Sequence, residues 1–164
     1  MKLILTIFTF LLMAKECDTN KASLSSNTSN NNVEKTTDME KVQKDITLVY
    51  NANSRGFFEE IVVTIDSITI YTNRNKTNPT KVACSTEDWN SCMTLLETIE
   101  VKKLPSLEAP TKMRHYDGAA HATLTIKNKE ESYQTSTFDH GHPPQEIKAI
   151  VDRILLFKKD KIKH

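Results

Sequence analysis

Five residues in two short segments carry side chains that bind transition metals. His115 and His121 flank a five-residue segment, and His140 and His142 alternate directly after Asp139. Imidazole nitrogens and carboxylate oxygens are ligands for divalent metals, so a site could form if the two segments met in the fold. The alternative interpretation places these residues in loops and at the start of a helix, where Asp139 accepts backbone N–H groups. We expect no metal and no other cofactor.

The sequence holds no complete catalytic signature. Neither H-E-x-x-H nor the G-x-S-x-G motif of serine hydrolases is present. The three glycines form no phosphate-binding loop. The 164 residues contain 22 basic and 21 acidic side chains, a balance that does not favour a nucleic-acid partner. We therefore expect a protein that is not an enzyme.

An apolar run near the start of the chain indicates export. Two residues, Met1 and Lys2, precede an uninterrupted run from 3 to 13, and Cys17 follows shortly afterwards. A charged start and a short apolar core are typical of a signal peptide, here residues 1–16. The cysteine resembles the lipidated residue of bacterial lipoproteins, although Lys15 and Glu16 replace their usual small residues. This resemblance implies diacylation of Cys17 and anchoring to a membrane of the cell envelope, with the outer membrane as the expected location.

The remainder divides into a tether, a domain and a tail. Residues 17–44 follow the signal and are rich in Ser, Thr and Asn, so they bury too little apolar surface to fold. We expect a globular domain over residues 45–158 and a basic tail over 159–164.

Apolar residues of the domain recur with period 2 in some segments and with helical spacing in others. Strands are predicted at 46–50, 57–65, 68–71, 120–126 and 132–138, because apolar and β-branched residues recur there with period 2. A turn is predicted at 51–56. Helical spacing predicts a helix that begins near Ser85 or Thr86 and ends before Pro105, and a last helix over 145–157. The order β-β-β-α-β-β-α predicts an α+β fold, with a small antiparallel sheet and two helices on one face.

The two other cysteines, Cys84 and Cys92, flank the start of the first helix. Export permits a disulfide, and closing so short a loop contributes about 2–3 kcal/mol. We therefore predict a Cys84–Cys92 disulfide, with two buried thiols as the alternative.

The spacing of the elements resembles that of the emfourin type of metalloprotease inhibitor. The resemblance rests on Ser54–Phe57 in a turn, on Asp117 before a strand, and on Pro144 with Ile147 in the last helix. It implies a protease-inhibitor-like domain.

Arg55, Phe57 and Phe58 could form a binding edge at that turn, or the aromatic rings could pack in the core. We expect a non-catalytic binding module whose partner is an envelope protein or a protease. The alternative is a periplasmic metal-binding protein or metal-dependent enzyme.

Overall fold

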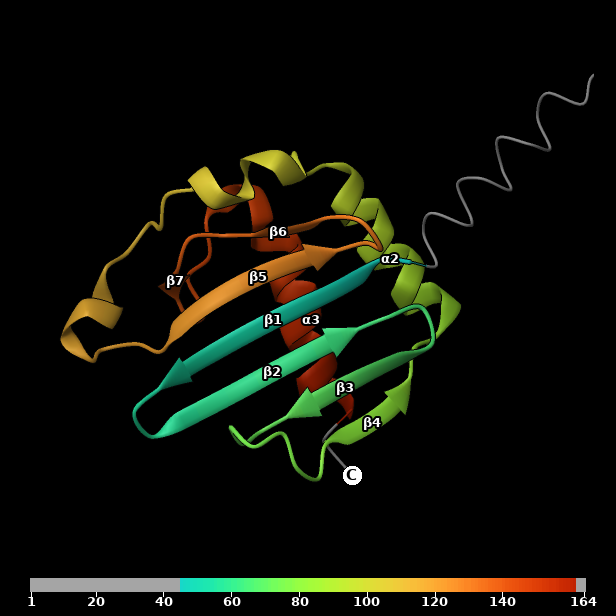
Figure 1. Ribbon diagram of the computed structural model, residues 1–164, viewed down its shortest axis with the longest axis horizontal. Helices are drawn as coiled ribbons and strands as arrows, with labels where there is room; N and C mark the ends of the chain where they lie inside the picture. Colours follow the sequence, from blue (N-terminus) through green and yellow to red (C-terminus); the bar gives the residue numbers. More distant parts are fainter. Residues whose placement is uncertain (1–44, 162–164) are drawn as a thin grey trace, which may run out of the picture. The chain divides into compact units, whose positions relative to one another are not determined.

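The computed structural model describes residues 45–161, which form one mostly antiparallel sheet and two main helices (Figure 1). The predicted α+β class is therefore confirmed. The strands are β1 (Thr47–Ser54), β2 (Phe57–Val63), β3 (Ser67–Tyr71), β4 (Thr80–Ala83), β5 (His121–Lys127), β6 (Ser132–Gln134) and β7 (Phe138–Asp139). The helices are α2 (Thr86–Glu97) and α3 (Lys148–Lys161), with 3-10 helices η1 (Val101–Ser106), η2 (Met113–Tyr116) and η3 (Gln145–Ile147). The predicted signal peptide, Cys17, the predicted tether and residues 162–164 lie outside the described residues.

β1 is a central strand of the sheet and pairs with a strand on each side. Its strand order is β4-β3-β2-β1-β5-β6, and β7 pairs with β5 beside β6. Leu48 lies opposite Val63 of β2 on one side and opposite Ile126 of β5 on the other. Every neighbouring pair of strands is antiparallel, so the loops gather at the two ends of the sheet.

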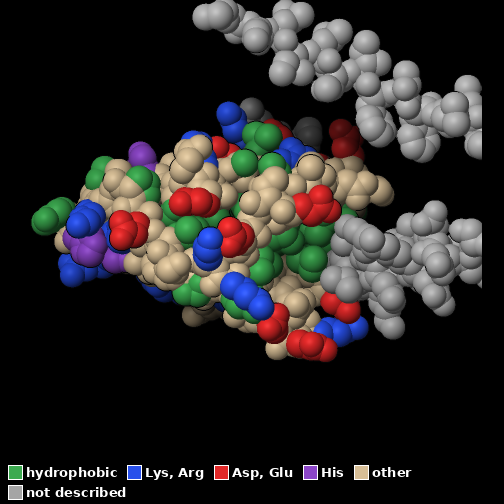
Figure 2. All heavy atoms as spheres, turned by 90° about the horizontal axis from the view of Figure 1, so that it is seen from above, with side chains coloured by type: hydrophobic (Ala, Val, Ile, Leu, Met, Phe, Trp, Pro, Cys, Tyr) green, Lys and Arg blue, Asp and Glu red, His purple; other side chains and the backbone are tan. Residues whose placement is uncertain are grey.

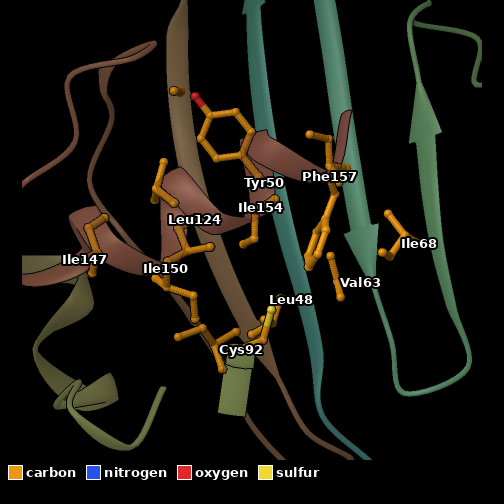
Figure 3. Packing of buried hydrophobic residues seen from close by; sticks show 14 of the residues in the cluster. Leu48, Tyr50, Val63, Ile68, Cys92, Leu124, Ile147, Ile150, Ile154 and Phe157 are labelled. Atoms are coloured by element: carbon orange, nitrogen blue, oxygen red, sulfur yellow. The ribbon is translucent and has the colours of Figure 1, made fainter. Parts of the chain in front are cut away.

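One face of the sheet is covered by the helices. Period-2 alternation directs every second strand residue toward α3, where Leu48, Tyr50 and Leu124 are fully buried (Figure 3). The other strand residues of the core are Ala52, Ile61, Val63, Ile68, Ile70, Ala122, Ile126 and Phe138. The helices supply Trp89, Cys92, Met93, Ile150, Val151, Ile154 and Phe157.

The helices begin largely where capping chemistry predicts. The Ser85 hydroxyl accepts the Asp88 amide at 3.1 Å, which caps α2 as expected. Before α3, residues 145–147 form a 3-10 turn, so the predicted helix over 145–157 begins as η3 and continues to Lys161.

Several strand boundaries differ from the prediction. Asn51–Ser54 was predicted as a turn but belongs to β1, because backbone pairing with β2 and β5 continues through these polar residues. The predicted strand at 132–138 is divided into β6 and β7 by residues 135–137. β4 was not predicted, and its backbone pairs with β3 without an apolar run of its own.

One end of the sheet carries the longer loops. We call it the loop end, and it comprises residues 55–56, 72–79, 111–121 and 139–144 (Figure 1, left). The opposite end comprises residues 45–46, 64–66, 84–88 and 128–131. Since β1 runs from Thr47 at the opposite end to Ser54 at the loop end, the segment that precedes the domain joins it opposite to the loop end.

Candidate functional site

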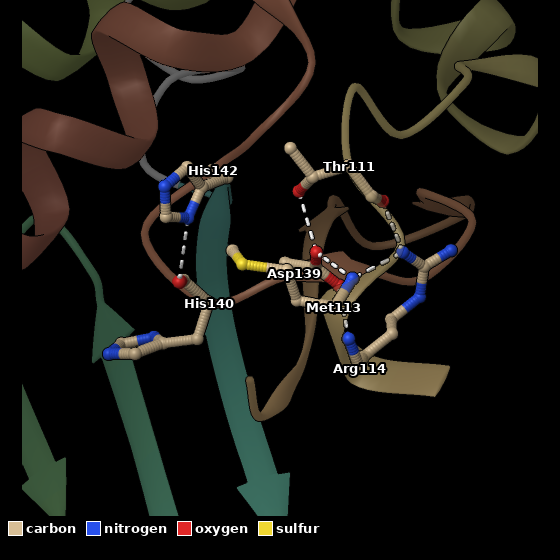
Figure 4. A network of polar contacts seen from close by, with 6 residues as sticks. All are labelled: Thr111, Met113, Arg114, Asp139, His140 and His142. Carbon is tan, nitrogen blue, oxygen red and sulfur yellow. Dashed lines mark hydrogen bonds and ion pairs between the residues drawn. The ribbon is translucent and has the colours of Figure 1, made fainter. Parts of the chain in front are cut away.

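A buried carboxylate organises the loop end. Asp139 of β7 is fully buried and accepts four hydrogen bonds (Figure 4). One oxygen accepts the Thr111 hydroxyl and the Met113 amide, each at 2.6 Å. The other accepts the Arg114 amide at 2.9 Å and its guanidinium at 3.0 Å. Both oxygens are thus fully engaged by one short stretch of the incoming loop.

The same contacts keep Asp139 charged. Burial raises the pKa of a carboxyl group, but the hydrogen bonds from Thr111, Arg114 and Met113 outweigh it and hold the pKa of Asp139 well below its usual range. The Arg114 side chain is only 10% exposed and forms an ion pair with Asp139. The carboxylate and the guanidinium therefore neutralise each other inside the protein.

η2 is fixed in a projecting position as a result. Asp117 ends this short helix with a φ of 56°, and the Gly118 amide donates to the Met113 carbonyl at 3.0 Å. A side chain on Gly118 would bring a Cβ to 3.3 Å from that carbonyl oxygen, so a glycine fits the close approach. Tyr116 is 85% exposed and Met113 is 38% exposed. The loop therefore presents two large apolar side chains on a fixed backbone.

Charge is unevenly distributed between the two ends of the sheet. Basic side chains outnumber acidic ones at the loop end, and the reverse holds at the opposite end. The loop end carries Arg55, Arg74, Lys76, Lys112, Arg114, Asp117 and Asp139, and the opposite end carries Asp45, Asp66, Glu87, Asp88, Lys129, Glu130 and Glu131. Figure 2 shows the lysine, arginine and histidine side chains gathered around a projecting apolar tip at the left of the molecule.

A second polar cluster lies between the sheet and α3, next to the loop end. The Tyr50 hydroxyl lies 2.7 Å from the Nδ1 of His140, whose ring centroid is 5.4 Å from that of Phe57. Glu59 of β2 is 1% exposed and forms an ion pair with Lys158 of α3. These residues come from β1, β2, α3 and the segment after β7.

The environment of this cluster disfavours charge on its ring nitrogens and its phenol. Burial lowers the pKa of His140, and Glu59 opposes that effect while Lys158 adds to it. Burial is also the main reason that the pKa of Tyr50 is raised, with a further contribution from Glu59. The Nδ1 of neutral His140 can therefore accept a hydrogen bond from the Tyr50 hydroxyl.

The predicted metal ligands are not brought together. Among residues 45–161, no group of three or more His, Cys, Asp or Glu side chains is placed to hold a metal ion. Asp139 is engaged by the loop and His140 by Tyr50, while His115, His121 and His142 are exposed. A tight turn with Gly141 at a φ of 83° separates His140 from His142, whose amide donates to the Asp139 carbonyl.

The predicted binding edge is divided between the two faces of the sheet. Phe57 packs half-buried against His140 on the core side, whereas Phe58 lies on the other side with Arg74 at 5.9 Å from its ring centroid. Successive strand residues point to opposite faces, so the two rings cannot share one edge. Arg55 is exposed and belongs to the loop end.

The predicted disulfide is absent from the structure. No cysteine pair lies at disulfide distance in the part of the chain described. The Cys84 amide donates to the Asp66 carbonyl at 3.2 Å, which holds Cys84 at the β2–β3 turn. Cys92 is buried on the core-facing side of α2. Burial raises the pKa of the Cys92 thiol to about 11, with a further contribution from nearby Cys84.

Sequence reasoning missed the partners of the buried carboxylates Asp139 and Glu59. Thr111 and Arg114 lie far from Asp139 in the sequence, and no local pattern connects them. The burial of Glu59 could have been predicted, because Glu59 occupies the same face of β2 as the buried Ile61 and Val63. A carboxylate on the core side of a strand requires a partner, and Lys158 supplies it.

No helix among residues 45–161 is long and apolar enough to cross a membrane. A comparison with protein-family models finds no match, and a comparison with curated proteins finds none either.

Proposed function

We propose that this protein is a membrane-anchored envelope lipoprotein whose domain is a non-catalytic binding module, with the loop end as its contact surface. The observation that carries the proposal is the buried Asp139, whose four hydrogen bonds hold η2 in a projecting position. A fixed loop binds a partner at a lower entropic cost than one that must be ordered on contact.

The position of the loop end supports the same proposal. The chain enters the domain at Asp45, at the opposite end of the sheet. The chain therefore does not enter the domain through the surface that we propose as the contact surface. A protease-inhibitor-like module is one form of this proposal, because the spacing of the elements resembles that of emfourin-type inhibitors.

A photo-crosslinking experiment tests the contact surface. A photoreactive residue replaces Tyr116 in the lipidated protein, and isolated envelopes are irradiated and probed for adducts. We expect one dominant protein adduct. A control with the same residue in place of Glu130, which is exposed at the opposite end, should not form it. Equal adducts from both positions, or none from position 116, would contradict the proposal.

The anchor is tested separately by labelling with palmitate. We expect label in the native chain and none in Cys17→Ala. Label that persists in Cys17→Ala would refute lipidation at this residue.

A further inference from the structure

The loop end carries positive charge that the protein does not neutralise. Arg55 and Lys112 are exposed, and neither belongs to any ion pair formed within residues 45–161. Arg74 donates to the Ser54 carbonyl and lies over the Phe58 ring, which fixes its position. Arg74 also belongs to none of the ion pairs found in the described part of the chain.

The other cations of this end are already compensated. Lys76 pairs with Glu60 at 2.6 Å, and Arg114 pairs with the buried Asp139. The one other carboxylate of the loop end, Asp117, is exposed on the projecting loop. Arg55, Arg74 and Lys112 therefore give this end a positive potential that remains for a partner to complement.

A large apolar side chain is exposed at this positive end. Tyr116 is 85% exposed, more than any other large hydrophobic side chain among residues 45–161. A tyrosine offers a large, stiff contact area, and such residues often provide much of the binding energy of an interface when they enter a pocket.

The shape of this end decides which partner it fits. Two pockets in the described part of the chain lie elsewhere, one of about 290 Å³ beside Thr98 and Glu146 and one of about 150 Å³ beside Ile46 and Tyr133. The loop end instead projects. A projecting side chain fits a pocket on a folded partner better than it fits an extended polymer, which would follow a groove.

We propose that the loop end binds an acidic surface of a folded protein, with Tyr116 in an apolar pocket and with Arg55 and Lys112 facing carboxylates of that protein. This inference rests on the proposed function and adds the chemistry of the partner. A lipid headgroup is the alternative source of negative charge, but a bilayer surface offers no preformed pocket for the projecting Tyr116.

The charge requirement is tested first with a purified chain. The chain from residue 17 onward, with Cys17→Ser to exclude lipidation, is titrated with poly-L-glutamate and the dissociation constant is measured. We expect binding that weakens steeply as NaCl rises from about 0.05 to about 0.5 M, since screening shortens the range of the charges. Because poly-L-glutamate offers carboxylates but no pocket, it tests the charge requirement alone. Absence of binding to it at low salt would overturn that requirement and with it the inference.

A charge-reversal pair and its matched control locate the binding. Arg55→Glu with Lys112→Glu should weaken poly-L-glutamate binding at least about tenfold, because each substitution replaces attraction by repulsion. Lys127→Glu with Lys129→Glu changes the net charge equally, at the opposite end of the sheet, and should weaken binding much less. An equal loss in both pairs would show that only net charge matters and would overturn the inference.

The source of the negative charge is decided by two further measurements. Vesicles of phosphatidylglycerol should bind the Cys17→Ser chain no better than neutral phosphatidylcholine vesicles do. Marked preference for phosphatidylglycerol, abolished by the loop-end reversal, would assign the surface to lipid and overturn the proposal.

The adduct formed from position 116 gives the second measurement. Mass spectrometry of that adduct should find the crosslink in a segment rich in Asp and Glu. An adduct in a segment without acidic excess would overturn this inference but leave the proposed function standing. Binding to poly-L-glutamate with no envelope adduct would instead count against the proposed function.

Discussion

Replacing Asp139 by Asn removes one charge and keeps the size of the side chain, so the variant isolates what the carboxylate does for the loop. In the structure, one oxygen takes donors from Thr111 and Met113, and the other takes both donors of Arg114. An amide has one oxygen and one NH₂ group. Whichever way the introduced amide turns, its NH₂ meets a backbone N–H, and the Arg114 guanidinium loses its counter-charge.

The cost follows from the burial of the pair. Asp139 is fully buried and the Arg114 side chain is 10% exposed, so neither recovers full hydration when the pair is broken. Removing one partner of a buried pair costs about 3–5 kcal/mol. Because Arg114 retains some access to water, we expect a loss of about 3 kcal/mol in the free energy of unfolding. That loss is a large fraction of the roughly 5–15 kcal/mol that stabilises a typical domain.

Urea unfolding followed by fluorescence measures this loss, because Trp89 is the single tryptophan of the chain and is buried on the core-facing side of α2. Asp117→Asn is the matched control. Asp117 lies in the same loop, is exposed, and has a φ of 56° that Asn adopts readily, so we expect a change below about 0.5 kcal/mol. A loss below about 1 kcal/mol in Asp139→Asn is no more than one ordinary hydrogen bond contributes, and it would refute the stabilising role assigned to Asp139.

Three further predictions concern the buried titratable groups. Because the pKa of His140 is lowered in the folded state, the unfolded chain binds a proton at this residue more readily than the folded chain does. The free energy of unfolding should therefore fall as the pH drops below the ordinary histidine pKa of 6.5. Urea midpoints that do not fall between about pH 7.5 and about pH 5.5 would contradict this prediction. Lys158→Met leaves the buried Glu59 unpaired, and since Lys158 is partly exposed we expect a loss of about 1–3 kcal/mol. Adding Glu59→Gln should recover part of it, and strictly additive losses in a double-mutant cycle would argue against coupling. With a thiol reagent at neutral pH, Cys84 should react well before the buried Cys92, whose pKa is raised to about 11; equal labelling rates by mass spectrometry would contradict the burial of Cys92.

Much of the fold could be predicted because local patterns and tertiary packing agree. In β5, Ala122, Leu124 and Ile126 alternate with polar residues and are buried as expected. The C-terminal half of β1 was missed because Asn and Ser disfavour strands, yet pairing on both sides carries the backbone through them. β4 was missed for a related reason, since only its pairing with β3 defines it.

The candidate site was less predictable than the fold. The sequence left two interpretations of Asp139 open: a weak candidate ligand of a metal site shared with the histidines, or an acceptor of backbone N–H groups. In the structure Asp139 accepts the backbone N–H groups of Met113 and Arg114 and the Thr111 hydroxyl, which lie 25 to 28 positions earlier. Such long-range hydrogen bonds depend on how β7 and the loop are placed, and a single sequence carries no periodic signal for that placement.

The strand order also determines when the sheet can be completed. β1 meets β2 through a short hairpin, but its other neighbour, β5, begins at His121, and Ile126 lies roughly 80 positions after its partner Leu48. Closing a loop of that length costs about 4 kcal/mol of chain entropy before any contact is gained. The hairpins of β1–β4 can therefore form early in folding, while β5 docks late. Until it does, β1 exposes an unpaired edge that can accept a strand from another chain, so a chain shortened before His121 should aggregate rather than remain a smaller folded unit.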